Sequence, residues 1–408
     1  MGTALPAFAG VGIELEYAIV DRASLDVRPY ADALVGNVER TEGTRVDWSN
    51  ELVAHVVEVK NPQPVRDLAT LPHAFAAAVQ RANERLASRD ARLLPTGMHP
   101  WMDPATETSL WDGEGAAIYA AFDRLFDCRR HGWANLQSMH VNLPFDGDEE
   151  FARLHAAVRV LLPLIPALAA SSPYAGGRLQ PALDQRLVEY RDNSLRFPEI
   201  TGAVVPDNAT SRDGYERDIL APIYRAVAPV DSARTLQHEW LNARGAIARF
   251  DRSALEIRVC DAQECPRADL AIAALLVAIA RALYEERWSD AQAQRALPTA
   301  DLAAILARTV DAADGARIEH PGYLALFGLA ASRCTAREAW HALLDRCGDD
   351  AVACNPDARR PLALLDARGP LARRLVGALG AGPSRDALRD AYRELADCLA
   401  ANRLYDPA

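Results

Sequence analysis

The sequence predicts an α+β fold in which an antiparallel β-sheet is flanked by helices. Short segments rich in valine, isoleucine and leucine alternate with helical stretches over residues 1–265, whereas the sequence after about residue 290 is helical throughout. Strands that are joined by hairpins or by helical excursions favour an antiparallel sheet. We therefore expect residues 1–290 to form the main domain and residues 291–408 to form a helical segment packed on it.

Each expected element follows from its own pattern. Strands are expected where short apolar runs end in turn residues, at 12–21, 52–60 and 135–145, with a β-hairpin over 247–261 that turns at 251–253. Helices are expected where apolar residues recur with helical spacing, at 72–88, 115–127, 148–170, 214–228, 268–287, 300–313, 335–347, 360–379 and 385–402. Residues 92–104 are expected to be a loop. Residues 171–213 are rich in Pro, Gly and Asn, and such a long irregular segment is often functional.

Composition narrows the classes of function. The chain has 45 basic and 56 acidic residues, a net charge of −11, which argues against nucleic acid or an anionic membrane as the main partner. Lys60 is the only lysine, so a phosphate-binding loop of the Gly-Lys-Ser/Thr type is excluded. The seven cysteines are scattered and odd in number, as expected for free thiols in the cytoplasm. The apolar run 160–170 is too short to span a bilayer and contains two prolines.

Four expected strands carry polar residues at alternating positions, and alternating residues share one face of a strand. In each strand the residues between them are apolar and can pack on helices. The pairs are Glu14 and Glu16, Glu58 and Lys60, His140 and Asn142, and Glu256 and Arg258.

Each pair taken alone also has an ordinary structural explanation: a solvated sheet face, a surface ion-pair ladder or a structural histidine. Together they gather carboxylates on one face, where neighbouring carboxylates repel each other. Divalent cations remove that repulsion most simply, and Mg²⁺ and Mn²⁺ prefer oxygen ligands with an occasional imidazole. Because Mg²⁺ usually completes its ligand shell with phosphates, an acidic face beside Arg258 indicates a metal–nucleotide site.

Six motifs resemble the glutamate–cysteine ligase superfamily, and most closely its family 2, the carboxylate–amine ligases. They occur in order between residues 12 and 265: GIELEY, ELVAHVVEVKNPQP, PTGMHPW, MHVNLPF, SSPYAGGR and ALEIRVCDAQ. The resemblance implies the fold of glutamine synthetase and guanidino kinases, an antiparallel sheet that forms a funnel for ATP and two or three Mg²⁺ ions. Residues 1–290 would then be the ligase catalytic domain.

The resemblance also implies roles for individual residues. The metal ligands would be Glu14, Glu16, Glu51, Glu58, His140 and Glu256. Arg258 would contact phosphate, with Glu58 as its catalytic partner and with Arg249 and Lys60 as further nucleotide-binding residues. Glu51 lies seven residues before Glu58, so we expect it in a turn or a bulge before the strand. The second histidine of the family's His-Val-His motif is replaced here by Asn142.

The implied reaction has two steps: a carboxylate attacks the γ-phosphate of ATP, and an amine then attacks the resulting acyl phosphate. Metals and arginines suit it, because phosphoryl transfer depends mainly on positioning and charge neutralisation. For the amino-acid substrates we expect contacts from Arg178 or Arg191, from His99 and from Asn142. Cys260 is expected on the side of Arg258, as a packing residue.

Two alternatives to the ligase stay open from the sequence, together with one possible interface. A guanidino-type phosphotransferase would use the same face without an amine acceptor. A catalytically silent binding paralogue would keep the fold but would not need to keep repulsive carboxylates. The apolar helices at 268–287 and in the tail are candidates for a homodimer interface.

Overall fold

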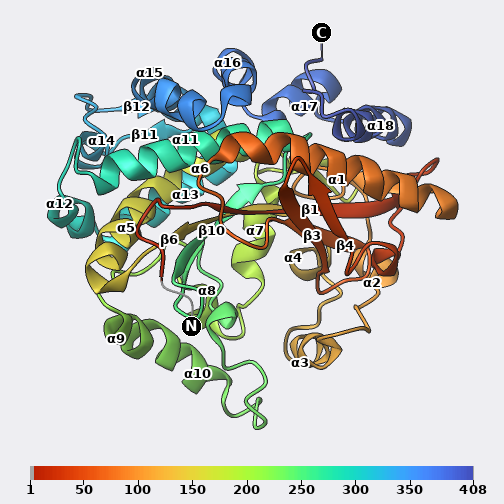
Figure 1. The fold of residues 1–408 in the computed structure, drawn as a ribbon, viewed down its shortest axis with the longest axis horizontal. Helices are drawn as coiled ribbons and strands as arrows, with labels where there is room; N and C mark the ends of the chain where they lie inside the picture. Colours follow the sequence, from red (N-terminus) through yellow and green to blue (C-terminus); the bar gives the residue numbers. More distant parts are fainter. Residues whose placement is uncertain (1–3, 408) are drawn as a thin grey trace.

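The fold is built on one large sheet whose neighbouring strands are all antiparallel, which confirms the predicted α+β class (Figure 1). The computed structural model describes residues 4–407. The strand order is β2-β3-β4-β1-β6-β10-β9, and β5 pairs with the second half of β1. The strands are β1 (Gly12–Asp21), β2 (Val38–Thr41), β3 (Thr44–Asn50), β4 (Val56–Lys60), β5 (Ala91–Leu94), β6 (Ser138–Pro144), β9 (Ala246–Arg249) and β10 (Ala254–Asp261).

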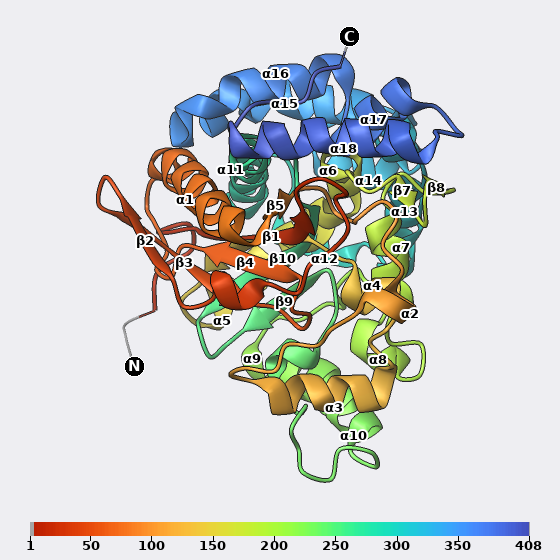
Figure 2. The same cartoon turned by 90° about the vertical axis from the view of Figure 1, so that its right-hand side faces the viewer.

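Helices lie in two layers over one face of this sheet (Figures 1 and 2). Helices α1 (Leu71–Leu86) and α5 (Gly147–Leu161) contact the strands, and α11 (Pro266–Tyr284) packs against both helices. Helices α15 (Ala336–Cys354) and α16 (Arg359–Arg368) form the outer layer on α11. Apolar residues at alternate strand positions, such as Leu15, Val141 and Ile257, are fully buried in the core that these helices close.

The opposite face of the sheet is covered by shorter elements that leave room for a cavity. They are α2 (Pro104–Glu107), α3 (Ala116–Phe126), α4 (His131–Ala134), α7 (Gln185–Asp192), α8 (Pro198–Thr201), α9 (Arg212–Tyr215) and α10 (Ala221–Val227). The remaining helices are α6 (Ile165–Ala169), α12 (Ala291–Ala296), α13 (Thr299–Ala312), α14 (Pro321–Leu326), α17 (Leu371–Leu379) and α18 (Arg385–Ala400), and two short strand pairs are β7 (Tyr174–Ala175) with β8 (Arg178–Leu179) and β11 (Arg317–Ile318) with β12 (Cys334–Thr335). The predicted division at residue 290 stays a prediction.

Several expected bounds were wrong for local reasons. The hairpin β2–β3 and the strand β5 were missed, because β2 is mostly polar and β5 is only four residues long. Helix α7 was missed because its sequence, QRLVEYRD, is short and has no repeated apolar spacing that marks a helix. The predicted helix 360–379 is two helices, separated at Gly369 and Pro370, where Gly369 has a φ of +78°.

The apolar stretch 147–169 is the one candidate for a membrane span among the described helices, by length and composition. Its most apolar window is 89% buried inside the protein. A helical stretch that is apolar and buried in the protein belongs to the core of the fold.

A bulge in β10 corrects the expected position of Cys260. Ile257 lies opposite Val141, but Cys260 lies opposite Met139, so two residues of β10 face one residue of β6. The extra residue turns Cys260 to the apolar face and Asp261 to the polar face. Cys260 is fully buried in the core, and all seven cysteines are free.

Candidate active site

The predicted carboxylates do come together, because four neighbouring strands place them in register. Glu14 lies opposite Lys60 on one side and opposite His140 on the other. Glu16 lies opposite Glu58. The next strand, β10, brings Glu256 opposite Asn142. Side chains opposite each other in a sheet are direct neighbours, so the acidic set forms one continuous patch.

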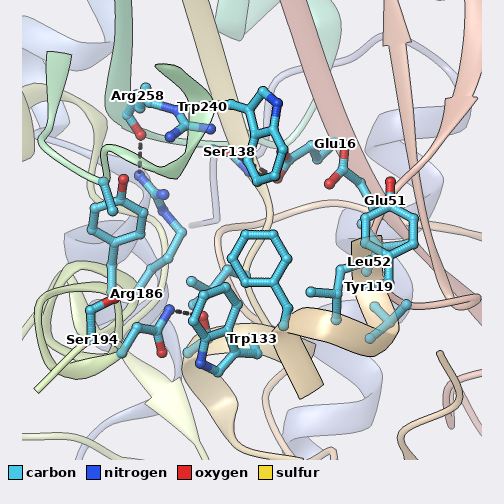
Figure 3. A pocket seen from close by; sticks show the side chains of 18 of the residues that line it. Glu16, Glu51, Leu52, Tyr119, Trp133, Ser138, Arg186, Ser194, Trp240 and Arg258 are labelled. Atoms are coloured by element: carbon cyan, nitrogen blue, oxygen red, sulfur yellow. Dashed lines mark hydrogen bonds between the residues drawn. The ribbon is translucent and has the colours of Figure 1, made fainter. Parts of the chain in front are cut away.

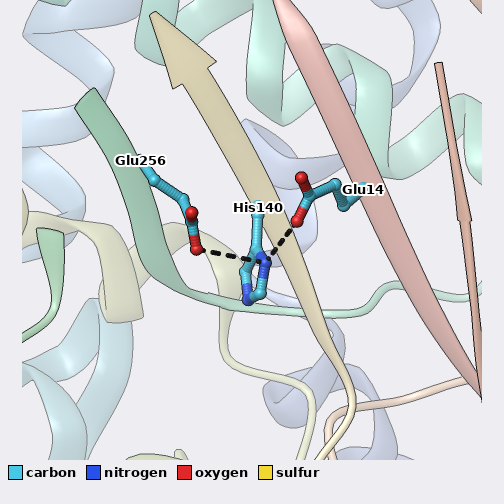
Figure 4. A group of neighbouring side chains, drawn as sticks. All are labelled: Glu14, His140 and Glu256. Carbon is cyan, nitrogen blue, oxygen red and sulfur yellow. Dashed lines mark hydrogen bonds and ion pairs between the residues drawn. The ribbon is translucent and has the colours of Figure 1, made fainter. Parts of the chain in front are cut away.

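His140 is the centre of this patch (Figure 4). Its Nδ1 lies 2.9 Å from Glu14 Oε2 and 3.7 Å from Glu256 Oε1. On the other side of the ring, Nε2 lies 2.9 Å from Ser138 Oγ and 3.9 Å from Glu16 Oε1. Two sets of potential ligand atoms therefore share the imidazole: Glu14, His140 and Glu256, and Glu16, Glu58 and His140, each within 4.8 Å of one another.

Two serines hold the carboxylates in place, and sequence reasoning missed both. Ser138 donates to Glu16 Oε2 from its backbone N–H at 2.7 Å and from its hydroxyl at 2.9 Å. Ser49 donates to Glu58 Oε1 at 2.7 Å. Ser138 is two residues before His140 and so shares its face of the strand. The alternation of residues along the strand could therefore have predicted this serine. Ser49 depends on the unpredicted strand β3.

Glu51 lies in the connection between β3 and β4, as expected for a residue outside the regular strand. Burial, together with the charges of Glu16 and Glu58, raises the pKa of Glu51 well above its usual value. Burial and the charge of Glu14 raise the pKa of Glu58 to about 7, despite the opposing charge of Lys60. The patch therefore holds more carboxylates than its own cations neutralise.

Glu14 and His140 shift in the opposite way. Burial alone would raise the pKa of Glu14, but the hydrogen bond and charge of His140 outweigh it and lower that pKa. Burial alone would lower the pKa of His140, but Glu14, Glu16 and Glu256 raise it. The neighbouring carboxylates thus favour the protonated form of the imidazole when no metal is bound. This donor set, oxygen-rich with one imidazole and in charge excess, fits Mg²⁺ or Mn²⁺.

Three predicted cations border the acidic patch. Arg258 Nε lies 2.8 Å from Glu256 Oε1, and Arg249 Nη1 lies 3.4 Å from Glu256 Oε2. Lys60 forms an ion pair with Glu58. The charges of Glu58 and Glu14 raise the pKa of Lys60 against the effect of burial. These three residues lie where phosphate oxygens bound to metals at the patch could be reached, but their roles remain predictions.

A cavity of about 320 Å³ opens beside the patch (Figure 3). Its walls include Glu16, Glu51, His140 and Arg258 from the predicted set, together with Arg186, which was not predicted. Most of the remaining lining residues are aromatic or aliphatic: Leu52, Val53, Val56, Tyr119, Phe122, Trp133, Leu136, Tyr190, Ile200, Trp240 and Leu241. The volume is within the range of small-molecule sites.

The structure does not bring Arg178 and Arg191 to this cavity. Arg178 lies exposed on β8, and Arg191 is exposed on α7, where it pairs with Asp192. Helical geometry explains the position of Arg191, because residues five positions apart on α7 face different directions. Arg186 therefore faces the cavity, whereas Arg191 faces solvent.

His99 and Asn142 also lie outside the cavity lining. His99 is 1% exposed; its Nε2 lies 2.7 Å from the Leu25 carbonyl, and its Nδ1 accepts from the Met102 N–H. This is a loop-holding role, and burial lowers the pKa of His99 to about 4. Asn142 instead supports the acidic patch, since its amide donates to Glu14 Oε1 at 3.3 Å.

Arg186 is held in place by residues from three of the sequence motifs. Its Nε donates to Asp261 Oδ1 at 2.5 Å. Asp261 also accepts from the Ser171 N–H at 2.8 Å and from the Ser172 hydroxyl at 2.7 Å. Gly97 leaves room for this carboxylate, because a Cβ there would lie 2.4 Å from it. The motifs with Gly97, Ser171 and Asp261 thus meet at one point, behind the arginine.

Comparison with known proteins identifies the family. The model of glutamate–cysteine ligase family 2 (GCS2) matches residues 10–393, so the chain belongs to this family. An uncharacterized protein of Archaeoglobus fulgidus is 37% identical over 282 residues, which cover 68% of this chain and 75% of that protein. A Rubrobacter xylanophilus protein with the provisional name glutamate–cysteine ligase 2-3 is 30% identical over 283 residues, or 67% of this chain and 70% of that one.

A solved structure agrees with the fold. The glutamate–cysteine ligase of Francisella tularensis, determined in complex with AMP, superposes with a TM-score of 0.60 over 99% of this chain and 91% of that chain. At 11% identity, the likeness shows the fold alone. Membership of family 2 makes the chain an ATP-dependent carboxylate–amine ligase, an enzyme class that accounts for an acidic sheet face beside arginines.

Proposed function

We propose that this ligase binds Mg²⁺ or Mn²⁺ at the acidic patch and joins an amino-acid carboxylate, with glutamate as the first candidate, to the amine of a second amino acid. The observation that supports this most is the position of the patch: Glu16 and His140 belong both to the potential ligand sets and to the wall of the cavity, which Glu51 also lines. Metal-bound phosphates and an organic substrate would therefore meet at one surface.

Different residues of the patch would bind the cations and the phosphate. Glu14, His140 and Glu256 would hold one cation, and Glu16, Glu58 and His140 offer a second set. Bound there, a divalent cation supplies charge neutralisation for phosphate oxygens. Arg258 and Lys60 flank the patch and would bind and orient the γ-phosphate, which is the main requirement of phosphoryl transfer.

The chemistry balances without a covalent protein intermediate. A substrate carboxylate oxygen bonds to the γ-phosphorus of ATP, and ADP leaves. The amine nitrogen then bonds to the carbonyl carbon of the acyl phosphate, inorganic phosphate leaves with the C–O electron pair, and the amine proton passes to solvent. The cavity walls would protect the acyl phosphate from water until the amine attacks.

The test is Mg²⁺-dependent formation of ADP from ATP by the full-length chain. Amino acids are offered singly and in pairs, with glutamate and cysteine among them, and the products are identified by mass spectrometry. We expect one pair to give ADP together with a condensed amide. Glu256→Gln should give neither, whereas Glu319→Gln, which removes an exposed carboxylate far along the sequence, should match the unaltered enzyme.

Other outcomes would favour the alternatives. Phosphate transfer to a guanidino compound without amide formation would identify a phosphotransferase on the same sheet. ATP binding with no turnover for any pair would indicate a silent paralogue. The predicted cytoplasmic location and homodimer are separate proposals, which fractionation and light scattering can test.

A further inference from the structure

Three residues in the wall of the cavity carry hydrogen-bond donors that have no partner within the described residues. Arg186 is 2% exposed; its Nε is bonded to Asp261 and its Nη2 to the Arg258 carbonyl, but Nη1 has no hydrogen bond to any part of the chain between residues 4 and 407. The Ser194 hydroxyl and Trp133 Nε1 are also buried without a partner within the same described residues. All three residues line the cavity.

These residues come from two helices that contact each other, α4 and α7, and from the residues directly after α7. Trp133 belongs to α4, Arg186 to α7, and Ser194 follows directly after α7. Figure 3 shows the Arg186 and Ser194 side chains across the cavity from Glu51, with Arg186 reaching toward Arg258. Buried polar groups are nearly always paired, so donors without partners indicate a ligand rich in acceptors. A carboxylate matches an arginine fork and two neutral donors.

A second wall of the cavity is aromatic. The ring of Phe122 lies between those of Trp133 and Trp240, with centroid distances of 5.3 Å and 5.7 Å. Because these rings pack on one another, the wall is already in place before a ligand binds. The thiol of cysteine is too small to cover such a surface, whereas a bulky apolar side chain would remove much of it from water.

We propose that the amine substrate is an α-amino acid with a bulky apolar or aromatic side chain, whose carboxylate is bound by Arg186, Ser194 and Trp133. Its three substituents then match three walls. The carboxylate lies at the α4–α7 donors, the side chain lies on Phe122, Trp133 and Trp240, and the amine points to the acidic patch. This inference rests on the proposed function, because it assigns the amine partner of the same ligation.

The test measures binding of amino acids by isothermal titration calorimetry, with the full chain and without ATP or Mg²⁺. Failure of the proposed ligation therefore cannot be confused with failure of this site. L-Phenylalanine should bind about ten-fold more tightly than L-cysteine, which lacks the aromatic side chain, and than L-phenylalaninamide, which lacks the carboxylate. Equal binding of cysteine would overturn the aromatic assignment, and equal binding of the amide would overturn the carboxylate assignment.

Ser194→Ala separates binding from folding. It removes a hydroxyl that has no partner, so the melting temperature should not fall, yet phenylalanine binding should weaken about five- to ten-fold. Ser88→Ala, at an exposed serine, is the matched control. Arg186→Lys should weaken binding further, whereas Arg217→Lys, at an exposed arginine paired with Asp218, should not.

Two results would reject the site. Absence of phenylalanine binding at millimolar concentrations would do so directly. The second result has two parts: ATP alone displaces phenylalanine, and Ser194→Ala weakens ATP binding as much as phenylalanine binding. The donors would then bind the nucleotide rather than the amino acid.

Discussion

The two faces of the central sheet are built from the same strands but have opposite physical properties. One face carries Leu15, Val141 and Ile257, fully buried and packed under helices. The other carries the buried carboxylates of Glu16, Glu58 and Glu256, whose negative charges repel one another. The apolar face contributes stability through burial, whereas the polar face costs stability that binding of cations would offset. Adjacent residues of one strand thus have different roles: one stabilises the fold and the next belongs to the candidate site.

The largest expected effect tests the polar face. Glu16→Gln removes a carboxylate that belongs both to a potential metal set and to the cavity wall. We expect kcat for amide formation to fall on the order of 1000-fold, comparable with the loss of one group that stabilises transition-state charge. Steady-state assays over a range of Mg²⁺ concentrations measure it. An enzyme that keeps full activity would exclude the patch from the reaction.

The residue directly before Glu16 tests the apolar face. Leu15→Ala creates a cavity in the core, and we expect the free energy of unfolding to fall by about 3 kcal/mol. Urea unfolding at 25 °C measures it. At temperatures where the variant is folded, its kcat should stay within about two-fold of the unaltered enzyme. A large loss of activity in the folded variant would show that the two faces are not separable.

Two buried histidines sharpen the comparison at acid pH. His140 is surrounded by carboxylates, but His155 lies against Phe151 and Tyr215, and neither of its ring nitrogens has a partner among residues 4–407. Burial, helped by the charge of Arg159, lowers the pKa of His155 to about 3. The unfolded chain binds a proton near pH 6.5 that the folded chain does not, so stability is lost as the pH falls below about 6.5.

The loss from His155 should approach 1.4 kcal/mol per pH unit, or about 2 kcal/mol at pH 5 relative to pH 7.5. His155→Phe should remove this part of the pH dependence. Urea unfolding of both proteins across pH 5 to 8 tests the prediction. If the difference between the two stability curves stays constant over this range, His155 is not the group that titrates.

The smallest effect concerns the bulge in β10. Because Cys260 faces the core, Cys260→Ala should destabilise the fold by about 1 kcal/mol and leave kcat unchanged. Burial raises the thiol pKa above its usual range, so alkylation of the native protein should spare this cysteine. Labelling of Cys260 before unfolding would contradict the assigned face.

Sequence alone determined which residues of each strand share a face, because alternation along a strand depends only on local geometry. Glu14 and Glu16 needed nothing more than the two-residue period, whereas strand pairing brought His140 and Glu256 beside them. The helical layer over the apolar face followed from the same rule. The family motifs were also legible in the sequence, since they are continuous segments.

Tertiary structure decided what depends on contacts between distant segments. Arg186 replaces Arg178 and Arg191 at the cavity only because α7 forms, and because Asp261 and Ser172 hold the arginine from other parts of the chain. A one-residue bulge, set by pairing between β6 and β10, reversed the faces of Cys260 and Asp261. Local periodicity cannot specify such pairings, because their free energy comes from residues that are far apart in sequence.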